Sequence, residues 1–115
     1  MVAFSSPSGN IDCWLDDDSG WAPVRCDTGS HTWTAPPSGR PRDCTGDYGS
    51  TLGIGPHGGL FGCASDAIGP SAVLAYGKGI EVGKVRCLSS TEGMRCVDRS
   101  TGHGFLVSRD RVHLF

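Results

Sequence analysis

The chain has 115 residues and a formal net charge of −2, and this length favours one domain, residues 1–115, with one hydrophobic core. Valine, isoleucine, leucine and phenylalanine supply only 23 residues, so we expect crosslinks to support a small core. The longest apolar run, Ala72 to Tyr76, is far shorter than the ~20 residues of a membrane-spanning helix, and no basic block marks nucleic acid as a partner.

Glycine and proline number 18 and 7 and are spread evenly, which excludes long helices and favours short strands separated by turns. The fold class predicted is all-β, a small barrel or sandwich of short antiparallel strands. The predicted strands, in chain order, are Val2 to Phe4, Ile11 to Leu15, Val24 to Asp27, His31 to Thr34, Thr51 to Ile54, Leu60 to Ala64, Ala72 to Tyr76, Lys84 to Ser89, Met94 to Asp98, Gly104 to Ser108 and Val112 to Phe115.

Three segments between these strands have the composition of turns and loops. Pro7 to Asn10 and Thr91 to Gly93 each place a glycine where a positive φ is needed. Residues 35–47 contain too much proline and glycine for a strand, and they predict a long surface loop that Cys44 ties down. Because a linker does not normally carry a crosslinked cysteine, this loop is not a domain boundary.

Six cysteines without a Cys-x-x-Cys pair favour three disulfides formed outside the cytoplasm over a zinc site. Fifteen pairings are formally open. Folding the chain about Thr91 and Glu92 sets Cys87 opposite Cys96, where a cross-strand disulfide can form. We therefore expect sequential pairing, with each bond contributing about 2–4 kcal/mol. The expected pairs are Cys13 with Cys26, Cys44 with Cys63, and Cys87 with Cys96.

Two weaker patterns are a similarity between two turns and an uneven distribution of charge along the chain. Residues 6–13 (SPSGNIDC) and 89–96 (SSTEGMRC) share a small-residue turn followed by a cysteine, which two hairpins of like construction explain without a true repeat. Residues 1–60 carry a net charge of −4 and residues 61–115 carry +2. A basic patch forms if neighbouring strands align Arg95, Arg99, Arg109 and Arg111, although solvated faces also explain the charges.

No signal peptide is visible at Met1 to Phe4. Because disulfides require export from an ordinary cell, we expect a sequence that begins after a removed leader or a membrane anchor, with Met1 added for expression. A cytosolic origin would instead require free thiols. The expected location is extracytoplasmic, either secreted or anchored to the envelope.

The sequence as a whole resembles a family of small secreted or membrane-tethered actinobacterial domains whose function is not established. The resemblance rests on FxSPSGNIxC from Phe4, VRCD from Val24, APP from Ala35, DC at Asp43, FxC from Phe61, LxYG from Leu74, CxSS from Cys87, GMxC from Gly93, TGHGFxxSR from Thr101 and the terminal Leu114-Phe115. One departure is Tyr48, where a tryptophan is expected. The resemblance implies export, a compact β-rich fold and no catalytic residues to carry over.

The sequence offers no convincing metal or cofactor site. Asp16, Asp17 and Asp18 suggest calcium, but an EF-type loop counted from Asp16 puts Gly20 at its fifth position and Trp21 at its sixth, where an oxygen ligand and then glycine are required. A solvated hairpin tip accounts for the three carboxylates. The four histidines have no metal-ligand spacing, so we expect no metal and no cofactor.

The pattern also argues against an enzyme. His57-Gly58-Gly59 is similar to the oxyanion turn of some esterases, but no Gly-x-Ser-x-Gly nucleophile motif accompanies it. His103 and Ser108 are five residues apart, which places them on opposite faces of a strand. His103 is therefore expected to pack its ring and donate a hydrogen bond to the backbone.

Tryptophan is the most suggestive residue type, because Trp14, Trp21 and Trp33 fall within twenty residues. Indole faces stack on sugars and anchor interfaces, but they also fill small cores. We expect Trp14 to face away from the crosslinked side of its strand and Trp21 to be exposed. The candidate ligand- or partner-binding residues are Trp21, Trp33, Tyr48, His103 and Arg109.

The function predicted is a non-catalytic extracytoplasmic module that recognises a cell-envelope glycan or an unknown protein partner. A different class of function is a secreted inhibitor of a protease or other hydrolase, in which the loop at residues 35–43 enters an active site. A preorganised loop of this kind binds tightly because little ordering entropy remains to be lost. A small hydrolase is the least favoured class.

Overall fold

The computed structural model describes residues 1–16 and 23–115, and these residues form two five-stranded antiparallel sheets and one turn of 3-10 helix, η1 (Pro37–Gly39). In chain order the strands are β1 (Val2–Ser5), β2 (Ile11–Leu15), β3 (Val24–Thr28), β4 (Asp47–Gly55), β5 (Gly58–Ala64), β6 (Gly79–Val82), β7 (Val85–Ser90), β8 (Gly93–Asp98), β9 (Gly104–Val107) and β10 (Val112–Leu114). The fold class prediction is confirmed.

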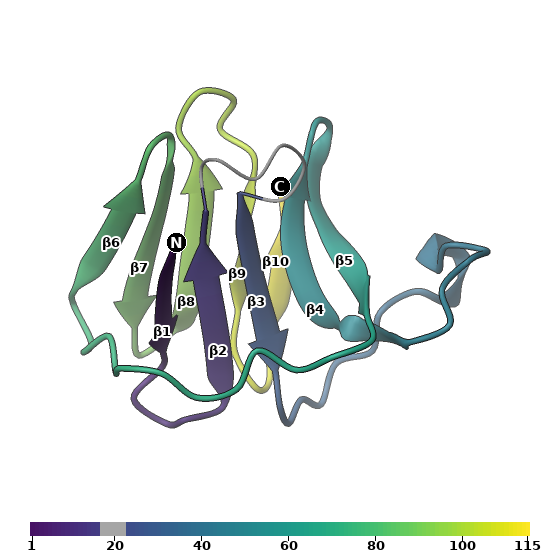
Figure 1. Cartoon of the computed structure of the whole chain (residues 1–115), viewed down its shortest axis with the longest axis horizontal. Helices are drawn as coiled ribbons and strands as arrows, with labels where there is room; N and C mark the ends of the chain where they lie inside the picture. Colours follow the sequence, from purple (N-terminus) through teal and green to yellow (C-terminus); the bar gives the residue numbers. More distant parts are fainter. Residues whose placement is uncertain (17–22) are drawn as a thin grey trace.

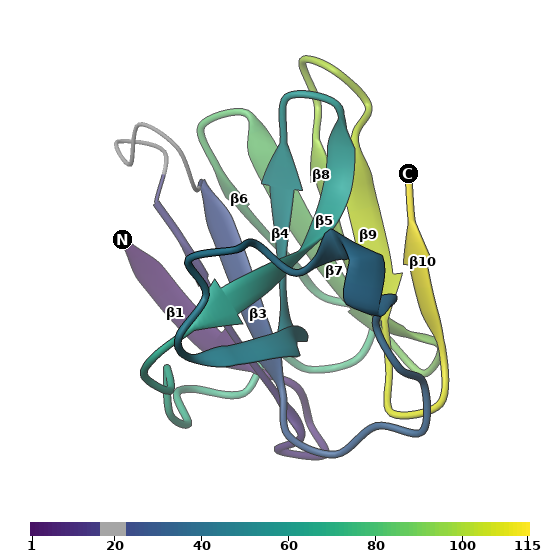
Figure 2. The same cartoon turned by 90° about the vertical axis from the view of Figure 1, so that its right-hand side faces the viewer.

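Each sheet is a meander in which neighbours in sequence are neighbours in space. The N-terminal sheet has the order β1-β2-β3-β4-β5, and the C-terminal sheet has the order β10-β9-β8-β7-β6 (Figure 1). The two sheets stack face to face as a sandwich and do not close into a barrel (Figure 2). This arrangement follows from alternating strands, because one face of each antiparallel sheet is apolar and must be covered.

The core lies between the sheets and consists of matching rows of directly opposed residues. One row crosses the N-terminal sheet through Phe4, Cys13, Cys26, Leu52 and Phe61. The other crosses the C-terminal sheet through Leu114, Phe105, Cys96, Cys87 and Ile80. A cystine therefore stands in each row, flanked by aromatic and aliphatic side chains.

All three predicted disulfides are confirmed: Cys13–Cys26, Cys44–Cys63 and Cys87–Cys96. The first and third join directly opposed residues of neighbouring strands, as the hairpin geometry predicted for Cys87. Their four cysteines are fully buried, and the Sγ atoms of Cys26 and Cys96 lie 4.0 Å apart. Because neither sulfur carries a hydrogen, this approach is a van der Waals contact that links the two sheets.

Two predicted strands are wrong, and one strand was not predicted. His31 to Thr34 is not a strand, because Trp33 turns toward the other sheet instead of pairing along a ladder. Ala72 to Tyr76 is also wrong. It makes one isolated bridge, from Val73 to Ser5, and only Leu74 of its large side chains is buried. The missed strand β6 has four residues, and their glycine and glutamate obscured its alternation.

Residues 65–78 form a crossover segment between the sheets. Figure 1 shows this segment, in teal and green, passing in front of the N-terminal sheet from β5 to β6. Backbone hydrogen bonds join Ser5 N to Ala72 O (2.9 Å) and Leu74 N to Ser5 O (2.8 Å). The apolar run of the sequence therefore serves to insert Leu74 at the edge of the core.

Residues 35–46 form the predicted surface loop, which projects beyond the β4–β5 edge of the sandwich (Figure 1). The Cys44–Cys63 disulfide ties its end to β5. The hydroxyl of Tyr48 donates a hydrogen bond to the Pro36 carbonyl (3.1 Å), and Arg40 Nη2 donates to the Cys44 carbonyl (3.1 Å). No helix of the described residues has the length and hydropathy to span a membrane.

Asp98 organises the turn that follows β8. Its carboxylate Oδ1 accepts hydrogen bonds from the Ser100 backbone N (2.9 Å) and the Ser100 hydroxyl (2.6 Å), and Lys84 Nζ lies 3.7 Å from Oδ2. Burial opposes ionisation of this carboxyl, but the hydrogen bonds from Ser100 together with the Lys84 charge outweigh burial and lower the pKa of Asp98. The folded state therefore holds Asp98 as a carboxylate.

We expect the Asp98→Asn variant to be less stable than the parent protein by about 1–3 kcal/mol at pH 7, because it loses charge-assisted hydrogen bonds. Since folding lowers the pKa of Asp98, its stabilisation is complete above the unfolded pKa of about 4 and disappears as the pH falls through the folded value. Urea unfolding at pH 7 and at progressively lower pH should show the two proteins converging in acid. Asp110→Asn, at an exposed turn position, is the matched control. A constant difference at every pH would contradict this assignment.

Candidate functional site

Trp33 and Tyr48, two of the predicted binding residues, have structural roles. The Trp33 ring stacks on His31 with ring centroids 3.9 Å apart, and its Nε1 donates a hydrogen bond to the Ser108 carbonyl (2.8 Å). The same ring packs against the core beside Phe61. Trp33 thus joins the segment after β3 to the turn after β9, whereas Tyr48 holds the projecting loop.

His31 fixes this arrangement from its other side. Its Nδ1 lies 2.7 Å from the Trp33 carbonyl, and its Nε2 lies 3.0 Å from Ser50 Oγ. Since a carbonyl can only accept a hydrogen bond, Nδ1 carries a proton, and in the neutral ring Nε2 then accepts from the serine hydroxyl. The stack on His31 and the hydrogen bonds at its Nε1 and its carbonyl therefore hold Trp33 in place, and its ring has little freedom to engage a ligand.

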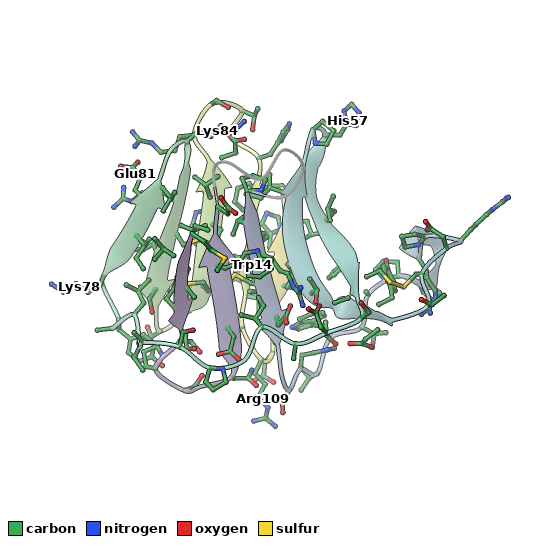
Figure 3. The ribbon with its side chains drawn as sticks, viewed as in Figure 1. Trp14, His57, Lys78, Glu81, Lys84 and Arg109 are labelled. Carbon is green, nitrogen blue, oxygen red and sulfur yellow. A yellow bond between two sulfur atoms is a disulfide. The ribbon has the colours of Figure 1, made fainter. Side chains whose placement is uncertain are left out.

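His103 and Arg109 lie at opposite ends of the sandwich. His103 precedes β9 and Arg109 follows it, so a strand about 13 Å long separates them. Figure 3 shows Arg109 extending from the lower end of the molecule. The His103 ring makes no hydrogen bond within the described residues, so the expected bond to the backbone is not found. Trp21 lies outside the described residues.

The structure therefore does not gather the candidate residues that it describes into one site. Trp14 does lie as expected, on the outer face of the N-terminal sheet with the Arg25 guanidinium 5.4 Å from its ring centroid (Figure 3). Ser108 also follows β9, so the strand that separates His103 from Arg109 separates His103 from this hydroxyl as well. No Ser/His pair forms from these two residues.

A pocket of about 150 Å³ opens between the sheets at the Arg109 end of the sandwich. We call it the hairpin pocket, because its walls come from the turn between β1 and β2 and the turn between β7 and β8. Its lining consists of Ser6, Ser8, Asn10, Ile11, Tyr76, Ser89, Ser90, Thr91, Gly93, Met94, Ser108 and Arg109. The two turns that resembled each other in the sequence are thus neighbours in space.

Local sequence explains how each turn presents its hydroxyls. Gly9 and Gly93 adopt φ values of 75° and 138°, which side-chain-bearing residues rarely reach, so each turn is tight. In the first turn the Ser6 hydroxyl accepts a hydrogen bond from Ile11 N (3.1 Å). Asn10 Nδ2 donates to the Ser30 carbonyl (2.9 Å), which fixes this turn against the segment after β3.

Several donors in the hairpin pocket remain unused. Ser89 is 1% exposed, yet its hydroxyl makes no hydrogen bond within the described part of the chain. The hydroxyls of Thr91 and Tyr76 and the Arg109 guanidinium likewise have no partner there. A hydroxyl that lines a pocket without a protein partner can bind water or a ligand there. Ile11 and Met94 form an apolar floor beneath these donors.

The mouth of the pocket combines a ring and a cation. Tyr76 is 52% exposed, and Arg109 is exposed. An aromatic face suits the apolar side of a sugar ring, and a guanidinium suits a carboxylate or phosphate. Of the predicted site residues, only Arg109 lines this pocket. Ser89, Thr91 and Tyr76 were missed, and the similarity between the two turns was the only sequence signal for the first two.

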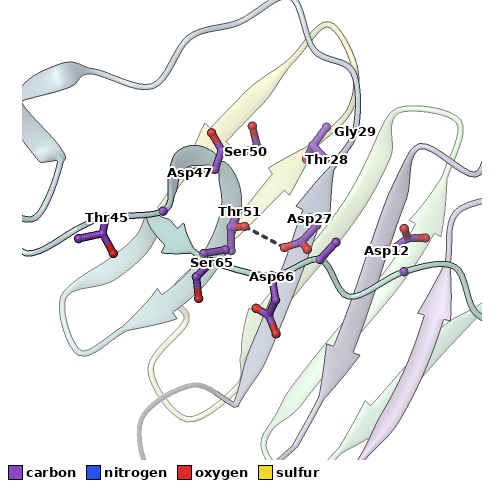
Figure 4. A pocket seen from close by; sticks show the side chains of 14 residues that line it. Asp12, Asp27, Thr28, Gly29, Thr45, Asp47, Ser50, Thr51, Ser65 and Asp66 are labelled. Atoms are coloured by element: carbon purple, nitrogen blue, oxygen red, sulfur yellow. Dashed lines mark hydrogen bonds between the residues drawn. The ribbon is translucent and has the colours of Figure 1, made fainter.

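A larger cleft of about 600 Å³ lies between the crossover segment and the outer face of the N-terminal sheet (Figure 4). Asp12, Asp27, Asp47 and Asp66 make it acidic. Asp27 is fully occupied, because Thr51 Oγ1 donates to its Oδ1 (2.8 Å) and Ile68 N donates to its Oδ2 (3.1 Å). The described residues contain no group of histidine, cysteine or acidic side chains suited to a metal ion. Asp17 and Asp18 of the calcium hypothesis lie outside those residues.

Arg25 supplies the counter-charge of this cleft. Its guanidinium contacts Asp27 (Nη2–Oδ2, 3.0 Å) and Asp66 (Nη1–Oδ1, 3.3 Å). Burial favours the neutral form of this side chain, but hydrogen bonds and charges from the two aspartates outweigh burial and raise the pKa of Arg25. The ion pairs secure the crossover segment to β3. These ion pairs give the Arg25 side of the cleft a structural role, whereas Thr28 Oγ1, from another residue of its lining, is buried without a hydrogen-bond partner in the described residues.

Comparison with known proteins confirms that the chain as a whole matches a family of unknown function. The model of the Family of unknown function (DUF6636) matches residues 1–115. No curated protein and no solved structure matches the chain significantly. The chain therefore belongs, over all 115 residues, to the DUF6636 family of unknown function.

Proposed function

We propose that this protein is a non-catalytic extracytoplasmic module that binds a cell-envelope glycan through the hairpin pocket. Three disulfides in so small a domain support a location outside the reducing cytoplasm. The resemblance to secreted or membrane-tethered actinobacterial domains supports the same location. The observation that carries the binding proposal is the Ser89 hydroxyl, which lines the pocket without a hydrogen bond in the described residues, together with an arginine at the pocket mouth.

The pocket chemistry favours a sugar that bears a carboxylate. The side chains of Ser89, Thr91 and Arg109 can donate hydrogen bonds to a ligand. A carboxylate offers two acceptor oxygens, and the Arg109 guanidinium can bind both at once. The half-exposed Tyr76 ring can cover a sugar face. At about 150 Å³ the pocket is smaller than the roughly 300 Å³ or more of a pocket for a whole drug-sized ligand, so it takes one group of a larger chain.

The positions of the reactive side chains support a binding role over catalysis. Acyl transfer needs a nucleophile within hydrogen-bonding distance of a base. The hairpin pocket contains serine and threonine hydroxyls but no histidine or carboxylate in its lining. All six cysteines are paired, so they offer no thiolate nucleophile.

We expect the protein to be retained on isolated envelope polysaccharide and the Arg109→Ala variant to bind at least about tenfold more weakly, because it loses charge-assisted hydrogen bonds. Arg111→Ala is the matched control, since Arg111 lies in the same turn, is exposed and does not line the pocket. Sedimentation with the polysaccharide at fixed salt measures both variants. Equal losses in the two variants would indicate charge alone and would refute recognition by the pocket.

The projecting loop supports a second candidate, inhibition of a secreted protease or other hydrolase. Residues 36–43 are all exposed, and the disulfide, Tyr48 and Arg40 hold the loop in one conformation. Loops fixed in this way lose little entropy when they enter an active site.

If the loop is inhibitory, stoichiometric protein should suppress a target hydrolase, and cleavage within residues 37–43 should relieve the suppression. Progress curves with a panel of extracellular hydrolases test this prediction. Tyr48→Phe, which removes only the hydrogen bond to Pro36, should weaken inhibition less than cleavage does. Inhibition that survives cleavage of the loop would count against this candidate.

A further inference from the structure

The outer face of the C-terminal sheet carries arginines and apolar residues in alternation. On β7, Arg86 and Leu88 point away from the core, and on β8, Arg95 and Val97 do the same. The register pairs Leu88 with Arg95 and Arg86 with Val97. Neighbouring strands therefore place each arginine diagonally from the other, with an apolar side chain beside each.

These side chains and Arg99 line a depression of about 250 Å³, which we call the arginine depression. No acidic residue contributes to its lining. The basic patch considered from the sequence is therefore partly wrong. Arg95 and Arg99 join Arg86 here, whereas Arg109 and Arg111 lie in the turn after β9.

The three guanidinium groups differ in their existing partners. Arg99 forms an ion pair with Glu81. Arg86 has no ion pair or hydrogen bond from its side chain within the described residues. Arg95 lies over the ring of Phe115, with its Cζ atom 4.5 Å from the ring centroid. Stacking covers the flat face of a guanidinium but leaves its N–H edge free, so Arg95 is oriented in advance to donate.

We propose that the arginine depression binds a phosphate group carried on a sugar. Two guanidinium groups from different strands present several donors from different directions. A planar carboxylate can satisfy one such fork, whereas the tetrahedral oxygens of a phosphate accept from both. Leu88 and Val97 provide apolar walls for the body that carries the phosphate. This site is separate from the hairpin pocket, with which it shares no lining residue.

NMR titration of the oxidised full chain with glucose 1-phosphate, inorganic phosphate and glucose, at constant ionic strength, tests this site. Glucose 1-phosphate should give saturable shifts in β7 and β8, and glucose should give none. Tighter binding of the sugar phosphate than of inorganic phosphate would support a role for the apolar walls. Equal binding would overturn the sugar part of the proposal and leave a site for free phosphate.

Arg86→Ala should weaken binding at least about tenfold, because a charge-assisted contact is lost. Arg86 has no side-chain partner to lose, so this variant should unfold like the parent protein. Arg95→Lys, which keeps the charge but loses the planar fork, should also bind more weakly. The matched control is Arg42→Ala, which removes one charge from the projecting loop and should bind normally.

Three results would overturn the site itself. They are the absence of saturable shifts with both phosphate probes, equal weakening by Arg42→Ala, and shifts confined to the hairpin pocket.

Discussion

The contact between two buried cystines at the centre of the sandwich is the constraint on which the remaining structure depends. Each sheet contributes one cross-strand disulfide to the core, and the Sγ atoms of Cys26 and Cys96 meet at 4.0 Å. The chain has few large aliphatic residues, so these sulfurs fill volume that leucine or isoleucine fills in other sandwiches. They also restrict the unfolded chain, which stabilises a domain with a thin core.

This central packing determines where the surfaces with chemistry lie. The cystines fix the register of β2 with β3 and of β7 with β8. With these registers, the turn between β1 and β2 and the turn between β7 and β8 lie at the same end of the sandwich. The hairpin pocket forms between those turns. The same registers order the outer faces. The charge difference between the two halves of the sequence thus becomes an acidic outer face on one sheet and arginines on the other.

Local sequence patterns correctly predicted the features that depend on residues close together in the sequence. Hairpin geometry was enough to pair Cys87 with Cys96, and alternation located most strands to within a few residues. The failures involve distant parts of the chain. Trp33 is a residue type that favours strands, but its indole N–H donates a hydrogen bond to a carbonyl 75 residues away in the sequence. The run from Ala72 to Tyr76 is apolar, yet its path is set by backbone hydrogen bonds to Ser5, which lies near the N-terminus and far away in the sequence.

The candidate site was harder to predict for the same reason. Ser89, in β7, and Ser6, after β1, have no distinctive sequence pattern, and only when the two sheets stack does the Ser89 hydroxyl face a pocket. Arg109 was identified as a basic residue, but its relation to Tyr76 depends on the path of the crossover segment. Resemblance between the two turns was visible in the sequence, whereas their proximity required the register of both sheets.

Stepwise reduction of the native protein, with alkylation and peptide mapping at each step, tests the central role of the two buried cystines most directly. The exposed Cys44–Cys63 bond should be reduced first, with the fold retained, because Cys63 is open to solvent. Cys13–Cys26 and Cys87–Cys96 should resist until the sandwich unfolds, and their reduction should coincide with loss of structure. Reduction of either buried cystine in a protein that stays folded would contradict this account.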